Sequence, residues 1–248
     1  MERQNINIEK KLAVLIDADN VSPNYVQYIF AEAVNHGIPT IKRIYGDWTR
    51  PELGRWKEPL LEYSVTPMQQ YGYTSGKNST DSALIIDAMD ILYAGNVEGF
   101  CIVSSDSDFT KLASRLRESG MYVVGMGEKK TPKPFVRSCE RFIYLENLEP
   151  PLTESGKAQQ KKNAVIHEES GELLMQIKRI VSEQDDEGGW VSLGKIGTIL
   201  VKRYPDFDSR NYGHSNLSKL VMSFDAFDID VRNTNNRHSK LYFIKNRD

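Results

Sequence analysis

Short apolar runs recur along the first part of the chain and alternate with segments in which apolar residues follow a helical period. Three runs are continuous and strongly apolar: Leu12–Ile16, Gly99–Val103 and Tyr122–Met126. Such runs are typical of strands that are buried on both faces of a parallel sheet. Weaker strands are predicted at Thr40–Tyr45, Val65–Gln70 and Phe142–Leu145, and helices at Pro23–His36, Glu52–Tyr63, Asp81–Ala94 and Phe109–Ser119. This alternation predicts an α/β domain in which helices flank a parallel sheet.

The character of the chain changes after residue 148. Residues 149–163 contain two prolines, small polar residues and a group of lysines, so we predict a linker between a first domain, residues 1–148, and a second domain, residues 164–248. The second domain is predicted to contain three helices followed by two short strands: Glu172–Val181, Lys195–Tyr204, Asn216–Phe224, Asp228–Arg232 and Lys240–Ile244. This order of elements is typical of a winged-helix domain.

Composition limits the classes of protein to which the chain can belong. Its 248 residues are 40% hydrophobic, and the net charge of −2 does not indicate a basic nucleic-acid-binding protein, so any contact with a polyanion must come from local patches. The two cysteines, Cys101 and Cys139, form no CxxC pair, so a zinc site is not predicted and Cys101 is expected to be buried. Neither a secretory segment nor a membrane span is visible, so we expect a cytoplasmic protein without a membrane partner.

Acidic residues follow two of the strongly predicted strands. Asp17 and Asp19 come directly after the first apolar run, and Asp106 and Asp108 come shortly after the run that ends at Val103. Because parallel strands end at the same edge of a sheet, these carboxylates are expected to meet there. Each of them taken alone is also typical of a helix cap or a turn, and Asp19 and Asp108 are suited to capping the helices that follow them.

A fifth acidic residue, Asp81, opens a predicted helix, with Ser79 or Thr80 placed to cap it. At about 100° per residue, Asp81 shares a helix face with four apolar residues, Leu84, Ile85, Ala88 and Leu92. Asp81 is therefore predicted to point toward the sheet. Asp87 and Asp90 are interpreted as charges on the helix surface.

Several carboxylates at one place repel one another unless they share protons or bind a cation. A set of oxygen ligands suits Mg²⁺ or Mn²⁺, and such ions activate water and polarise phosphodiester bonds. The acidic cluster therefore favours a metal-dependent phosphodiesterase, with Asp17, Asp81, Asp106 and Asp108 as the candidate catalytic and metal-binding residues.

The three acidic motifs, LIDADN, GKNSTDSALIIDAMDIL and VSSDSDF, resemble in this order the NYN domain of the LabA-like group, a branch of the PIN-like nucleases. The resemblance covers roughly residues 11–148. It implies a parallel-sheet fold, a divalent metal ion and hydrolysis of RNA, with the metal-binding positions at the four aspartates just named. Asn20 matches the family's polar residue after the first aspartate, which would hold a ligand or a water molecule.

Other polar groups near this edge of the sheet are candidates for a supporting role. Asp19 and Ser105 are suited to hydrogen bonds with the carboxylates or the substrate, although a capping role fits Ser105 equally well. Lys77, Arg50 and Lys129 are candidate contacts for RNA phosphates, because each follows or precedes an element that ends at the acidic edge. A solvated loop is the alternative interpretation for the two lysines.

The segment VSLGKIGTILVKRYPDFDSRNYGHSNLSKLVMSFDAFDI resembles the LOTUS domain, also called OST-HTH, which implies a winged helix that binds RNA or a protein partner. The candidate surfaces are Tyr212–Lys219 and the final hairpin. That hairpin carries several basic residues against Asp248 alone, which predicts a basic wing: Arg232, Arg237, Lys240, Lys245 and Arg247. Arg237 and Lys240 are the candidate RNA contacts, and a solvated hairpin is the alternative.

Three other functions stay open at this point. Asp17-Ala18-Asp19 also resembles the start of a haloacid-dehalogenase phosphatase, but Asn20 and the placement of Lys77 before Ser104 depart from the order of that family. A non-catalytic RNA-binding adaptor and a DNA-directed nuclease are compatible with the same motifs. The sequence does not specify the RNA target or the oligomeric state.

Overall fold

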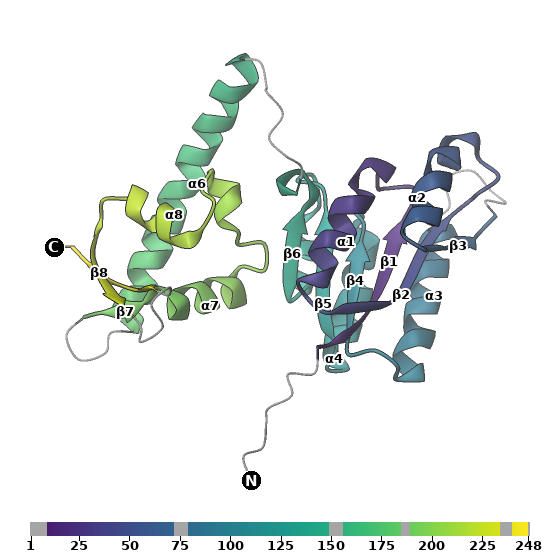
Figure 1. Ribbon diagram of the computed structural model, residues 1–248, viewed down its shortest axis with the longest axis horizontal. Coiled ribbons are helices and arrows are strands. Elements are labelled where there is room, and N and C mark those ends of the chain that lie inside the picture. The colour runs from purple at the N-terminus through teal and green to yellow at the C-terminus, as the bar shows by residue number, and fades with distance from the viewer. Residues whose placement is uncertain (1–8, 72–78, 149–155, 185–188, 234–239, 248) are drawn as a thin grey trace, which may run out of the picture. The chain divides into compact units, whose positions relative to one another are not determined.

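The computed structural model describes residues 9–71, 79–148, 156–184, 189–233 and 240–247 (Figure 1). The chain folds as two compact units, Met1–Pro150 and Pro151–Asp248. Within the described ranges, no helix combines the length and the apolar character needed to cross a bilayer.

The first unit is built on a parallel sheet. Its described strands are β1 (Lys11–Asp17), β2 (Ile38–Gly46), β3 (Thr66–Gln69), β4 (Gly99–Val103), β5 (Tyr122–Gly127) and β6 (Arg141–Tyr144). They lie in the order β3-β2-β1-β4-β5-β6, and every neighbouring pair is parallel. The chain therefore winds outward from β1 to β3, returns to the middle of the sheet at β4, and then winds in the other direction. The predicted parallel α/β architecture is confirmed.

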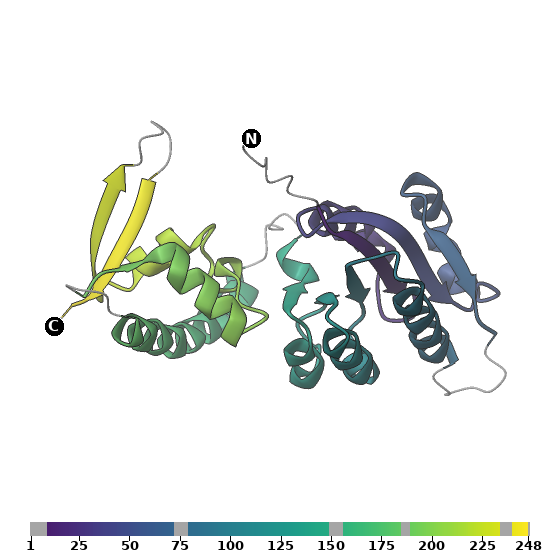
Figure 2. The same ribbon diagram turned by 90° about the horizontal axis from the view of Figure 1, so that it is seen from below.

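Helices cover both faces of this sheet (Figure 2). They are α1 (Val26–Val34), α2 (Lys57–Glu62), α3 (Ser79–Ala94), α4 (Thr110–Glu118) and α5 (Lys133–Ser138), with 3₁₀ turns η1 (Pro23–Tyr25), η2 (Pro51–Trp56), η3 (Ser107–Phe109) and η4 (Leu145–Asn147). Side chains alternate along β1, so Leu15 packs with α3, α4 and α5, whereas Ile16 packs with α1 and η2. Both native cysteines are buried free thiols, which confirms the expectation for Cys101.

Two local predictions for the first unit need correction. The single helix expected over Glu52–Tyr63 is a 3₁₀ turn, η2, followed by the short helix α2, whose third residue is Pro59. The stretch that begins at Lys133, for which no helix was predicted, forms α5, in which Pro134 lies in the first turn, where its missing N–H leaves no intrahelical bond unmade.

The second unit is a smaller assembly of helices and an antiparallel ribbon. Its elements are α6 (Gly156–Glu183), β7 (Val191–Ser192), α7 (Leu193–Arg203), η5 (Ser209–Tyr212), α8 (Leu217–Ser223), β8 (Phe227–Asn233) and β9 (Lys240–Asn246). The strands pair in the order β7-β9-β8, and both pairs are antiparallel. One apolar core holds the three helices against the ribbon, with Ile177, Ile196, Leu220 and Ile244 almost inaccessible to solvent. The predicted order of three helices followed by a ribbon is confirmed.

The segment expected to be a linker is partly helical. Residues 156–163 form the first turns of α6, so the helix begins well before the predicted start at Glu172. The reason is intrinsic propensity, because alanine, glutamine and lysine, which make up most of KAQQKK, are good helix formers. The proline-containing residues 149–155 lie outside the described ranges.

Candidate functional site

The site lies where the strand order of the first unit reverses, between the adjacent strands β1 and β4. In open α/β sheets this switch point leaves a crevice outside the carboxyl ends of the strands, and ligands bind there. Asp17 is the last residue of β1, and Ser104, Ser105 and Asp106 directly follow Val103, the last residue of β4. The fold therefore brings two distant acidic motifs to one edge of the sheet.

Asp17 is a fully buried carboxylate with all its contacts inside the protein. Its Oδ2 accepts hydrogen bonds from Ser104 Oγ at 2.8 Å and from Asn20 Nδ2 at 2.8 Å, and its Oδ1 accepts one from the backbone amide of Asp19 at 3.0 Å. Burial raises the pKa of Asp17, because a charge is poorly solvated there, and the three hydrogen bonds oppose that rise. Asn20 therefore orients the carboxylate, and Ser104, which directly follows β4, shares this role.

Asp81 lies in the first turn of α3 and is only 9% exposed. Its pKa is raised to about 6, first by burial and then by four neighbouring carboxylates, those of Asp17, Asp106, Asp108 and Asp19. These repulsions indicate that the four carboxylates lie near Asp81, at the same edge of the sheet. The structure thus brings together aspartates from β1, from α3 and from the turn after β4.

Asp106 and Asp108 differ in what they contact. Asp106 caps the turn η3, because its Oδ1 accepts a hydrogen bond from the backbone amide of Asp108 at 2.9 Å, while its own amide donates to Ser104 Oγ at 3.1 Å. Asp106 is half-buried and Asp108 is exposed. Asp106 is thus the N-cap of the 3₁₀ turn that leads into α4, and Asp108 lies in the first turn of η3.

Asp19 is held by two side chains and caps no helix. Thr80 Oγ1 donates to its Oδ2 at 3.0 Å, and Arg50 Nη1 contacts its Oδ1 at 3.0 Å. Thr80 therefore ties the start of α3 to the loop after β1, which corrects the expectation that it might cap its own helix. Arg50, a candidate RNA contact, is half-exposed at the rim of the site and is also 3.7 Å from Glu52.

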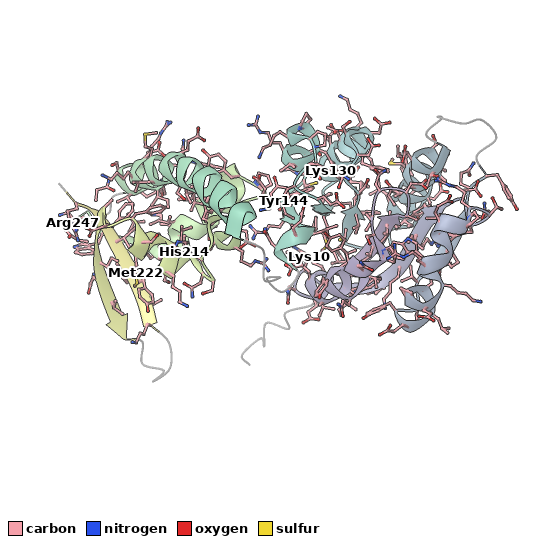
Figure 3. All side chains as sticks on the ribbon, turned by 90° about the horizontal axis from the view of Figure 1, so that it is seen from above. Lys10, Lys130, Tyr144, His214, Met222 and Arg247 are labelled. Carbon is pink, nitrogen blue, oxygen red and sulfur yellow. The ribbon has the colours of Figure 1, made fainter. Side chains whose placement is uncertain are left out.

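The loop after β5 borders the same edge of the sheet. Ser105 Oγ accepts a hydrogen bond from the backbone amide of Glu128 at 2.9 Å, so this side chain joins the loops after β4 and β5. Lys129 is exposed, and its backbone amide is held by Glu146. The next residue, Lys130, pairs with Glu128 at 2.8 Å (Figure 3). Two other candidate RNA contacts, Lys77 and Arg237, lie outside the described residues.

The donor chemistry of this edge fits a hard divalent cation. Five carboxylates and the amide of Asn20 offer oxygen ligands of the kind that Mg²⁺ and Mn²⁺ prefer, and Asp81 is an acid whose neighbours already disfavour its charge. In the part of the chain that the structure describes, however, no three acidic, histidine or cysteine side chains are already arranged as a metal-binding group. The ligands thus fit a divalent cation by chemical type, and the edge of the sheet at which they gather is the place where they would hold it.

Comparison with known families agrees with this geometry. The family model of the NYN domain matches residues 11–146, which is more than half of the chain. The chain belongs to the NYN domain family. A second family model, the OST-HTH/LOTUS domain, matches residues 168–239. These are the two families that the sequence motifs indicated, in the same order.

Similarity to individual proteins is weaker. No curated protein is similar enough in sequence to count as a match. The crystal structure of a protein of unknown function from Vibrio parahaemolyticus is similar, with 18% sequence identity and a TM-score of 0.47 over 56% of this chain and 94% of that one. A likeness of this size carries no argument about function.

The NYN domain also contains a polar network that sequence reasoning missed. Asp87 of α3 accepts hydrogen bonds from the guanidinium group of Arg43 and the hydroxyl group of Tyr45, both on β2. The side chain of Asp87 is 17% exposed, so its interpretation as a surface charge is wrong, whereas Asp90 is exposed as expected. The available signal was Arg43 itself, a charged residue within the predicted strand Thr40–Tyr45.

The wing of the OST-HTH domain carries more acidic partners than the sequence analysis took into account. Arg232 pairs with Asp230 at 2.7 Å, and Arg247, which directly follows β9 (Figure 3), pairs with Asp225 at 2.8 Å and with Asp228. The prediction set five basic residues against Asp248 alone and overlooked Asp228 and Asp230 on β8 and Asp225 before it. Lys240 remains an exposed candidate for RNA contact.

Proposed function

We propose that the NYN domain hydrolyses RNA phosphodiester bonds with a divalent metal ion, and that the OST-HTH domain binds the RNA. The single observation that carries this proposal is Asp81, a nearly buried acid whose pKa is raised to about 6 partly by the surrounding carboxylates. The start of a helix needs only one capping side chain and does not require five acids at the switch point. Because these acids repel one another, they lower the stability of the metal-free domain.

The residues at this edge would have distinct roles. Asp17, Asp81, Asp106 and Asp108 would hold the ion, which when bound supplies a polarised phosphodiester and an activated water molecule. Asn20 would keep the Asp17 carboxylate oriented through its hydrogen bond, as Ser104 does from the other strand. Asp19 does not need to touch the ion, since its two oxygens are engaged by Thr80 and Arg50.

The test is an RNA cleavage assay with the full chain. Single-stranded and hairpin RNAs are incubated with Mg²⁺ or Mn²⁺, with EDTA, and with the variants Asp17→Asn and Asp106→Asn. We expect products that disappear with EDTA and fall by at least about a hundredfold in each variant, since even outer-shell changes at metal sites cost ten- to hundredfold. Asp90→Asn is the matched control, because Asp90 is exposed on the same helix as Asp81 and should leave the rate unchanged.

An RNA-binding adaptor without catalysis is the second candidate, and one observation favours it. Among the described residues no metal-binding group is already assembled. In that case the wild type and Asp17→Asn would bind RNA with the same affinity, with or without metal, and neither would form product. The same assay on DNA of equal sequence decides between an RNase and a nuclease that accepts both, because only RNA offers the 2′-hydroxyl group.

A further inference from the structure

The polar network under α3 links the helix that carries Asp81 to the neighbouring strand. Arg43 and Tyr45 are two residues apart on β2, so both side chains lie on the face of the sheet that α3 covers. Both donate to the carboxylate of Asp87, and Tyr45 is fully buried. Burial and the adjacent Asp87 carboxylate raise the pKa of Tyr45, so its hydroxyl keeps the proton that it donates.

The apolar residues of α3 do not select a single rotation of the helix. Leu84 and Ala88 are fully buried against the sheet, yet Ile86 and Tyr93 are 62% and 74% exposed. A helix with apolar residues on more than one side can bury another face at similar free energy. A shift by one residue turns the helix by about 100° and moves it by about 1.5 Å, which would carry Asp81 away from the other acids.

The Arg43–Asp87 ion pair is partly buried, with side-chain exposures of 32% and 17%, so desolvation of the two charges offsets part of their attraction. The larger effect of the network is on the choice between alternative rotations of α3. Any other rotation would leave the fully buried hydroxyl of Tyr45 without its acceptor, Asp87, and an unsatisfied buried polar group is strongly disfavoured. The network therefore raises the free energy of the other rotations of α3 more than it lowers the free energy of the observed one.

We infer that Arg43, Tyr45 and Asp87 are positioning residues that fix the rotation of α3 and thereby hold Asp81 among the other carboxylates. Thr80, the residue before Asp81, supplies a second attachment through its hydrogen bond to the loop after β1. Asp87 lies six residues beyond Asp81, about 9 Å along the helix axis. The role of Asp81 in catalysis rests on the proposed function, whereas the inference that the network fixes the rotation of α3 is independent of it.

Thiol labelling measures the rotation of α3 without any assay of activity, because both native cysteines are fully buried. Ile86→Cys places a thiol on the exposed side of the helix, and Ala88→Cys places one on the buried side. In the otherwise unchanged chain, a maleimide should label the thiol of the Ile86→Cys variant at least about a hundredfold faster than that of the Ala88→Cys variant. The buried thiol can react only after α3 opens by local unfolding. When the apolar double substitution Arg43→Met/Asp87→Leu is added to each cysteine variant, the ratio of the two labelling rates should fall to less than about tenfold.

Mn²⁺ affinity and RNA cleavage measure the consequence for the site. The double substitution replaces an ion pair with an apolar contact of similar size, but it also removes the acceptor of the buried Tyr45 hydroxyl, so its urea midpoint should lie below that of the wild type. Under conditions in which the double variant is fully folded, its Mn²⁺ affinity and its cleavage rate should fall by at least about tenfold. Tyr45→Phe removes one donor and keeps the ring, so it should fold normally and lose two- to fivefold in both measurements. Asp90→Asn, on the exposed side of α3, should change neither.

Several outcomes overturn the inference. A folded double variant that keeps the wild-type labelling ratio shows that the network does not set the rotation, and a normal Mn²⁺ affinity shows that the rotation does not matter for the site. If the double variant fails to fold, an unchanged labelling ratio in Tyr45→Phe is the overturning result. If the wild type neither binds Mn²⁺ nor cleaves RNA while the labelling ratio still narrows, the proposed function fails and the positioning of α3 stands.

Discussion

Replacement of Asp81 by asparagine should stabilise the metal-free protein at neutral pH while it abolishes cleavage. The carboxylate is 9% exposed and lies among four other acids, so its negative charge is unfavourable in the folded state. Asparagine has nearly the same shape and no charge. The substitution therefore removes a repulsion and leaves the packing of the first turn of α3 unchanged.

The size and the pH dependence of the effect follow from the pKa. Asp81 changes from an ordinary value of 3.8 to about 6 in the folded protein, a difference worth at most about 3 kcal/mol. Solvent screening at the edge of the sheet reduces this to about 1–2 kcal/mol. Between pH 3.8 and 6 the folded chain binds more protons than the unfolded chain, so its free energy of unfolding decreases as pH rises through that window. The advantage of Asp81→Asn should thus be full above about pH 7 and shrink toward pH 4.

Urea unfolding in EDTA, at pH 5.0 and pH 7.5, measures the effect, with Asp90→Asn as the control that should stay within about 0.5 kcal/mol of the wild type. Addition of Mg²⁺ or Mn²⁺ should then reverse the order of stability at pH 7.5. A divalent ion at a hundred times its dissociation constant stabilises the folded state by about 2.7 kcal/mol, and Asp81→Asn should gain far less. The reasoning is refuted if Asp81→Asn is less stable than the wild type in EDTA at pH 7.5, or if its advantage is the same at both pH values.

Three further predictions concern other parts of the molecule. Ser104→Ala should lower the free energy of unfolding by about 1–3 kcal/mol, because it removes one of the three hydrogen bonds to the buried Asp17 carboxylate, and NMR titration should show the pKa of Asp17 still higher. Gly127→Ala should cost about 1–3 kcal/mol in urea unfolding, because its Cβ would lie 2.5 Å from the carbonyl oxygen of Ser104 and 2.6 Å from Thr131 Oγ1. RNA affinity measured in EDTA should fall by less than about tenfold between 50 and 200 mM salt, because Arg232 and Arg247 of the wing are paired with aspartates; a loss of a thousandfold would show many phosphate contacts.

The sequence was sufficient for the parts of the fold that depend on local pattern. Buried parallel strands are continuous apolar runs, so β1, β4 and β5 could be placed within a residue or two of their ends. Because parallel strands share an edge, the acids after β1 and β4 could also be expected to meet. The order of the strands could not be predicted from these patterns, since adjacency of β1 to β4 depends on pairing across more than 80 residues.

The errors about Asp87 and the wing share one physical cause. The surroundings of each charged residue were inferred from its own segment, whereas its charge partners come from other elements. Asp87 was interpreted as solvated because it lies at the flank of the apolar face of its helix. Its partner, Arg43, comes from β2, 44 residues earlier in the chain. The wing was interpreted as basic because β9 is basic, but the antiparallel register sets Asp228 opposite Lys245. Periodicity predicts which face is apolar, and only the pairing of elements determines which charges neutralise one another.

The balance of charges also constrains how this protein engages RNA. The NYN site is a concentration of negative charge, and the described arginines nearest to it and on the wing, Arg50, Arg232 and Arg247, are paired with carboxylates. A phosphate group approaching the metal-free site meets the carboxylates of five aspartates, so the site should repel it. A divalent ion would remove that repulsion and offer the phosphate a ligand position. Metal and RNA are therefore expected to bind cooperatively, each raising the affinity for the other by the same factor, because both oppose the same excess of negative charge.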